Sequence, residues 1–275
     1  MVSGILGRQV DAEQAILESM GFRFPCYREL KHQLGELDAL CECIELATRD
    51  LVNRASAAPD RHAYVADLAK HLGIHVNRVD VPSLRPHVAR LYILTVHQCL
   101  EDFLIGLRDE HPKGKEWDID DNADRLTKIA RTIGFEHTLA FDVCQYYRDI
   151  RNATVHRSAR NRIGGDGPAL EALRDRVAEN PALWNLHAPN RYEAVSFDDF
   201  VLFTRSTKTL AEDLCKAARP SDEELAEIVE AKTVNLESRF RKAPERLANA
   251  RSGFLQTTYS ISRQEADRIL AGLLA

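Results

Sequence analysis

Apolar residues recur at spacings of three and four along most of the chain, which is the pattern of amphipathic helices rather than strands. The stretch from Tyr27 to Ala57 repeats this spacing over many turns and predicts one long helix that packs along another. The stretch from Leu84 to His111 is apolar almost all round, so it predicts a central helix, with Ser83 as its N-cap. The apolar repeat of the first stretch consists of Leu30, Leu34, Leu37, Cys41, Ile44, Thr48 and Leu51.

Capping residues and helix breakers divide the rest of the chain into shorter helices. Gly73 and Gly134 follow apolar repeats and predict helix ends, because glycine readily adopts the left-handed conformation found there. The acidic run 118–121 offers N-capping carboxylates for a helix over 122–133. Further helices are predicted over 61–72, 169–179, 196–219 and from 221 onward. We therefore predict an all-α protein.

The composition agrees with a folded helical chain. A length of 275 residues with 44% hydrophobic content can bury a sizeable core. Only 13 Gly and 10 Pro are present, whereas strong helix formers are abundant, which favours helices over a turn-rich architecture. The formal net charge of -5 provides no overall basic field, so binding to a polyanion requires a local patch. The run 148–162, with five arginines and one aspartate, supplies such a patch.

The cysteines and the hydropathy indicate the compartment. No window approaches the roughly 20 apolar residues of a membrane span, and no N-terminal stretch joins a basic region to an apolar run. The six cysteines form no CxxC pair, so we expect buried thiols in a reducing environment and a cytoplasmic protein without membrane contact.

Two places could suggest a metal, and neither has convincing ligand spacing. His71 and His75 stand four residues apart, but Gly73 lies between them and no acidic ligand is near. The acidic run 118–121 does not match the spacing of a calcium loop, and capping explains it more simply. We therefore expect neither a metal site nor a cofactor.

The segment from Phe135 to Arg160 combines a core stripe with a polar face. At about 100° per residue its apolar side chains share one narrow stripe that should face the core. Asn152 and His156, four residues apart, should lie on the opposite face one helical turn from each other. The predicted core stripe consists of Leu139, Val143, Tyr146, Ile150 and Ala153, and the opposite face of Arg148, Arg151, Asn152, Val155 and His156.

The pattern Arg151-Asn152-Ala153-Thr154-Val155-His156 resembles the hallmark of the HEPN superfamily of all-helical ribonucleases and nucleotide-binding proteins. In that family an arginine and a polar residue precede a histidine near the end of a core helix. The flanking apolar stretches 84–107 and 197–219 are similar to the helices around it. The resemblance implies a HEPN-like helical bundle over 81–220. Outside that range the sequence pattern alone predicts an N-terminal helical region over 1–80 and a C-terminal helical extension over 221–275.

The resemblance also implies an activity, which is metal-independent cleavage of RNA at a two-fold dimer interface where two copies of the motif meet. Arg151, Asn152 and His156 would be catalytic, and we expect Arg148, Arg157 and Arg160 of the same basic run to bind the substrate. Histidine can act as acid or base near neutral pH, and the guanidinium suits phosphate oxygens. Stand-alone bacterial members act as toxins or anti-phage effectors, so a cognate antitoxin or an activating defence protein is an expected partner.

Two other interpretations of the motif remain open. Arg151 and His156 could belong to a solvated basic face, or could be cations favoured by the dipole at a helix C-terminus. Alternatively, the same face could belong to a non-catalytic helical module that binds RNA, a nucleotide or a protein partner.

Overall fold

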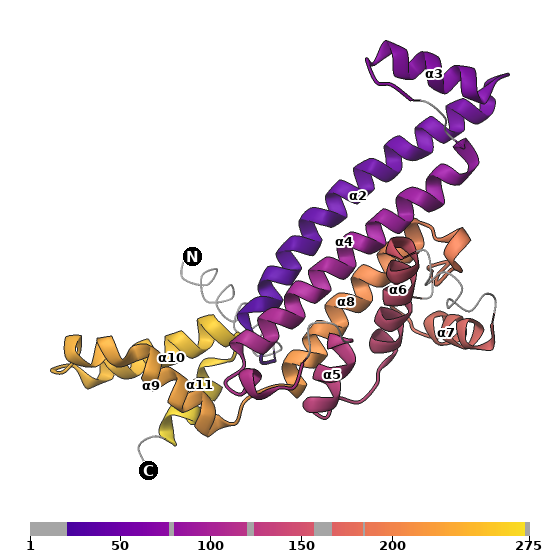
Figure 1. Cartoon of the computed structure of the whole chain (residues 1–275). Helices are drawn as coiled ribbons and strands as arrows, with labels where there is room; N and C mark the ends of the chain where they lie inside the picture. The colour runs from indigo at the N-terminus through magenta and orange to yellow at the C-terminus, as the bar shows by residue number, and fades with distance from the viewer. Residues whose placement is uncertain (1–20, 77–79, 120–123, 157–166, 184, 273–275) are drawn as a thin grey trace, which may run out of the picture. The chain divides into compact units, whose positions relative to one another are not determined.

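The computed structural model describes residues 21–76, 80–119, 124–156, 167–183 and 185–272 (Figure 1). The helices in chain order are α2 (Pro25–Ala57), α3 (Arg61–His71), α4 (Val81–Glu110), the 3-10 helix η1 (Gly114–Glu116), α5 (Arg125–Thr132), α6 (Leu139–Val155), α7 (Pro168–Ala178), the 3-10 helix η3 (Tyr192–Ala194), α8 (Phe197–Ala217), α9 (Asp222–Arg239), α10 (Pro244–Tyr259) and α11 (Arg263–Ala271). No strand occurs in these ranges, so the predicted all-α class is confirmed. None of the helices described has both the length and the apolar character of a bilayer span.

Several helices end where the sequence predicts. Gly73 and Gly134 adopt positive φ angles of 70° and 67° just past α3 and α5. Ser221 begins α9 with a capping box, in which its hydroxyl accepts from the Glu224 N–H and the Glu224 carboxylate accepts from the Ser221 N–H. These residues fix helix ends because they satisfy backbone groups that have no partner inside the helix.

The start of α4 differs from the prediction. This helix begins at Val81, so Ser83 lies in its first turn and is not the N-cap. The Ser83 hydroxyl donates instead to the Asp80 carbonyl at 3.0 Å. Pro82 is accommodated in the first turn because its missing N–H would find no helical partner there.

The start of α5 also differs. This helix begins at Arg125 rather than at residue 122, and Asp124 caps it by accepting a hydrogen bond from the Thr127 N–H. In the acidic run expected to cap the helix, Asp118 is exposed, and residues 120 and 121 lie outside the described ranges. The capping role belongs to Asp124 because an N-cap side chain must lie within three residues of the N–H that it accepts.

The chain divides into two compact units. Unit 1 draws on residues 1–29, 102–136 and 211–275, and unit 2 on residues 30–101 and 137–210. Consequently α2, α4 and α8 contribute residues to both units. The domain boundaries expected at residues 80 and 220 follow the sequence order and stay a prediction.

Unit 2 contains a bundle built from α2, α4, α6 and α8 (Figure 1). Lys208 of α8 pairs with Asp38 of α2 at 2.9 Å, and the ring of Tyr92 on α4 packs on that of Phe200 on α8. Its largest buried side chains from these helices include Leu34, Ile93, Tyr147, Ile150, Phe200 and Phe203. Each such side chain contributes roughly 1.5–3 kcal/mol through removal from water.

Unit 1 contains the mutually packed helices α9, α10 and α11. The Tyr259 ring at the end of α10 stacks on the Phe22 ring at 5.1 Å. Arg219 donates to Asp222 at 2.7 Å and to Glu265 at 3.0 Å, and so links the start of α9 to α11. The segment 221–275, expected as an extension, therefore packs against parts of the chain that are distant in sequence.

The cysteine positions agree in most cases with the expected buried thiols. Cys26, Cys41, Cys144 and Cys215 are buried, Cys99 is half-buried and Cys43 is exposed, and none of the six forms a disulfide. Burial raises the pKa of the Cys144 thiol to about 12. Thiols in such surroundings are unreactive and serve as small apolar side chains.

Candidate functional site

Helix α6 carries the motif, and its buried face anchors it in unit 2. Thr138 caps the helix, its hydroxyl accepting from the Phe141 N–H at 3.3 Å. Val143, Ile150 and Ala153 are completely buried, as the predicted stripe requires. The centre of the buried face differs from the predicted stripe. Tyr147 is completely buried and Cys144 nearly so, whereas the predicted members Leu139 and Tyr146 are half-buried.

Tyr147 is fixed by a buried carboxylate on α8. Its hydroxyl donates to Asp199 Oδ1 at 2.8 Å. The same carboxylate accepts from the Asn190 N–H at 2.7 Å, the Asn190 side-chain amide at 2.8 Å and the Ser196 N–H at 2.8 Å. Burial raises the pKa of Asp199 above its usual range, and these hydrogen bonds oppose the rise. Asp199 thereby joins α6, α8 and the loop between residues 185 and 196.

Contacts along α6 and α8 show that the two helices run in opposite directions. Cys144 lies against Thr207, whereas Tyr147, further along α6, lies against Phe203 and Asp199, which precede Thr207 on α8. The C-terminal end of α6 therefore lies toward the N-terminal end of α8. In unit 2 the motif and the loop before α8 consequently share one end of the bundle.

At that end the motif arginine and asparagine are in contact. The Arg151 Nη1 donates to Asn152 Oδ1 at 3.1 Å, and both side chains are half-buried. The amide oxygen thus orients one edge of the guanidinium, whose remaining N–H groups can meet an anion. Arg148, expected on the same exposed face, is also half-buried.

His156 lies just beyond α6 and not on it. The helix ends at Val155, and His156 has an extended backbone with φ -114° and ψ 107°. Its N–H still donates to the Asn152 carbonyl at 2.7 Å, and its side chain is exposed. The predicted helix continued to residue 160, whereas α6 ends at Val155. The hydrogen bond to Asn152 still closes one helical turn between the backbones of the two residues. The β-branched residues Thr154 and Val155 at the end of the helix favour this early end.

The structure does not describe every residue of the predicted site. Arg157 and Arg160, expected to bind the substrate, lie outside the described residues. His71 and His75 are both exposed. Within the described ranges, no group of three or more His, Cys, Asp and Glu side chains has an arrangement that could hold a metal ion.

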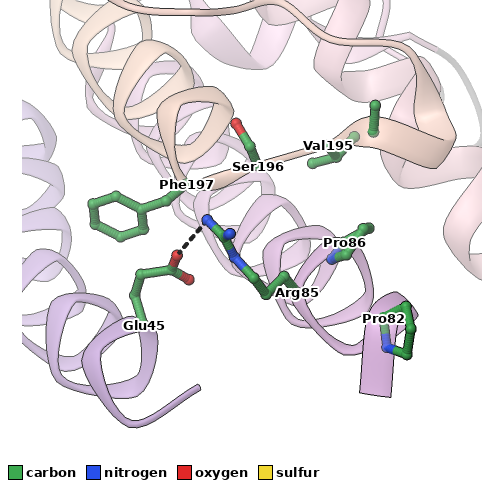
Figure 2. Close-up of a pocket in the computed structure, with 8 residues that line it drawn as sticks. Glu45, Pro82, Arg85, Pro86, Val195, Ser196 and Phe197 are labelled. Carbon is green, nitrogen blue, oxygen red and sulfur yellow. Dashed lines mark ion pairs between the residues drawn. The ribbon is translucent and has the colours of Figure 1, made fainter. Parts of the chain in front are cut away.

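A pocket of about 310 Å³ in unit 2 was not predicted from the sequence (Figure 2). It is lined by Glu45 of α2, by the first turns of α4 and by the segment 194–197 at the start of α8. Glu45 is 5% exposed. In the sequence, Glu45 stands four residues before Arg49, a spacing that suggests only an ion pair on the surface of a helix. The burial of Glu45 depends on α4 and α8, which are distant in sequence.

Comparisons of the chain with models of protein families, with curated proteins and with solved structures found no match.

We expect Tyr147→Phe to lower the free energy of unfolding by about 1.5–3 kcal/mol, because it removes a hydrogen bond to a buried carboxylate. Tyr146→Phe is the matched comparison, since the Tyr146 hydroxyl donates to the neutral Asn190 carbonyl and should contribute about 0.5–1.5 kcal/mol. Urea unfolding of both variants measures the difference. Equal losses would contradict the special role assigned to Asp199.

Proposed function

We propose that this protein is a metal-independent endoribonuclease of HEPN type in which Arg151, Asn152 and His156 act together at a dimer interface. The observation that carries the proposal is the contact between the Arg151 guanidinium and the Asn152 amide at the end of α6, with exposed His156 directly after it. A permanent cation and a titratable imidazole are thus presented at one helix end. These are the groups that phosphodiester cleavage at a 2′-hydroxyl uses.

The chemistry assigns a role to each residue. A base removes the proton from the ribose 2′-hydroxyl, and the oxygen attacks the neighbouring phosphorus. The bond to the 5′-oxygen breaks, and an acid supplies that leaving oxygen with a proton. His156 serves as acid or base near neutral pH. Arg151 stabilises the negative charge that builds up on the phosphate oxygens, and Asn152 holds the guanidinium for that task.

One copy of the motif provides one histidine, whereas the reaction needs both an acid and a base. A second copy related by a two-fold axis would supply the other. Val155, beside His156, supports an interface at this end of α6, because its apolar side chain is 50% exposed. In this proposal the protein acts as a toxin or anti-phage effector, with an antitoxin or an activating defence protein as partner.

Incubation of the purified full chain with total RNA in EDTA tests the proposal. We expect RNA cleavage to continue in the chelator, because His156 and Arg151 supply the proton transfer and the charge stabilisation. Sedimentation at micromolar concentration should show a dimer. Cleavage that stops in EDTA and returns with a divalent ion would refute metal independence, and RNA binding without any cleavage would favour the helical binding module.

A further inference from the structure

The pocket beside the start of α8 presents a buried carboxylate with an unused oxygen. The Glu45 side chain is 6% exposed, and its Oε1 accepts from Arg49 Nε at 2.7 Å. Arg85 Nη2 lies 3.8 Å from the same oxygen, too far for a hydrogen bond. Within the described chain, no hydrogen bond reaches Glu45 Oε2. Glu45 lines the pocket, so this oxygen is available there as an acceptor for a ligand that donates hydrogen bonds.

The other side chains that line the pocket are suited to contact the face of a planar aromatic ligand. Figure 2 shows Glu45 and Arg85 facing each other, with the rings of Pro82, Pro86 and Phe197 placed around them. Aromatic and apolar surfaces of this kind stack on nucleobases that are out of a helix. The volume of about 310 Å³ is at the lower end of small-molecule sites, which span roughly 300–1,000 Å³. It suits a single base or nucleotide.

The hydrogen-bonding groups of Glu45 and Arg85 discriminate among the four nucleobases. Glu45 offers acceptors, and the guanidinium of Arg85, which is 48% exposed, can turn from its weak ion pair to donate to a ligand. Guanine presents two adjacent N–H donors and one carbonyl acceptor on its Watson–Crick edge. Adenine and cytosine present one donor group beside an acceptor, and uracil presents one donor between two acceptors. Guanine alone therefore gives the carboxylate two donors while offering Arg85 an acceptor.

An ammonium ligand fits these groups less well. An ammonium group carries three donors and needs as many acceptors. The Ser196 hydroxyl of the lining donates to Asp199 at 3.0 Å and is thereby committed to the buried network behind the pocket. The side chains that line the pocket thus leave Glu45 as the main acceptor.

We propose that this pocket binds a guanine base, with Glu45 accepting from its N–H edge, Arg85 donating to its carbonyl and Phe197 contacting the ring. The pocket lies at the same end of unit 2 as the motif, because Phe197 begins α8 and α6 ends toward that point. A guanine of an RNA strand held there would set the position of cleavage. This second step rests on the ribonuclease proposal, whereas binding of the free nucleotide does not.

Calorimetric titration of the full chain with the four 5′-mononucleotides is the test. GMP should bind most tightly, and Glu45→Gln should weaken GMP binding by roughly 10- to 100-fold, because an amide cannot accept from two adjacent donors. The matched control is Glu42→Gln, on the exposed side of α2, which should leave binding unchanged. Arg85→Ala, at a half-exposed position that should not disturb folding, should also weaken GMP binding.

Equal binding of all four nucleotides, or no binding, would overturn the proposal. Unchanged GMP binding by folded Glu45→Gln would overturn it as well, and if that variant does not fold, unchanged binding by Arg85→Ala does so. Mapping of RNA cleavage sites separates the two proposals. If the wild type binds GMP but does not cleave RNA, the guanine pocket is supported and the ribonuclease proposal is refuted. If it cleaves RNA without preference for guanine and does not bind GMP, the ribonuclease proposal is supported and the guanine pocket is refuted.

Discussion

Replacing His156 by Ala should slow RNA cleavage by about 10²–10⁴-fold, the contribution typical of a general acid or base. The free energy of unfolding should stay within about 0.5 kcal/mol of the wild type, because the side chain is exposed and lies beyond the end of α6. Cleavage of a labelled RNA in EDTA measures the first effect, and urea unfolding measures the second. A loss of activity without a loss of stability would assign the imidazole to the chemistry.

His75→Ala is the matched control, since His75 is also an exposed histidine of unit 2 and has no part in the motif. It should cleave RNA as the wild type does. If His156→Ala cleaves RNA at the wild-type rate while circular dichroism shows intact helices, the ribonuclease proposal is wrong. The RNA-binding module would then replace it, provided that the variant still binds RNA.

The sequence predicted the helices well because their signals are local. The apolar repeat of α2 and the glycines after α3 and α5 act within a few residues of the structure that they determine. The start of α5 was missed because several carboxylates compete as caps, and only Asp124 lies three residues before the N–H that it accepts from. Tyr146 and Tyr147 both stand three or four residues from Val143 and Ile150. The apolar spacing alone therefore could not show which of the two tyrosines is completely buried.

The candidate site was predictable only where it is contiguous. Arg151, Asn152 and His156 stand within six residues and could be recognised as a pattern. The pairing of Tyr147 with Asp199 joins residues 52 positions apart, and Glu45 meets Arg85 across 40 positions. Such contacts depend on how the helices pack, and a single sequence gives no direct signal for them. The extended backbone of His156 follows two adjacent β-branched residues of weak helix propensity, a signal that the apolar periodicity does not contain.

Replacing Ile150 by Asp should destabilise the fold by about 4–5 kcal/mol or more. Ile150 is completely buried on α6, one residue before the motif arginine. The change removes roughly 1.5–3 kcal/mol of apolar burial and places a carboxylate among apolar side chains, where it has neither water nor a partner. Urea unfolding followed by circular dichroism measures the loss, and RNA cleavage should disappear together with the helical signal.

The control for this effect is Leu91→Asp, which introduces the same carboxylate on α4 of the same unit, at a side chain that is 56% exposed. That variant should unfold within about 1 kcal/mol of the wild type, because its charge remains in water. The two substitutions differ in burial and not in chemistry, so their difference isolates the cost of burying the charge. A small loss for Ile150→Asp would mean that the α6 face around Ile150 opens to water. The orientation assigned to Arg151 and Asn152 would then be wrong.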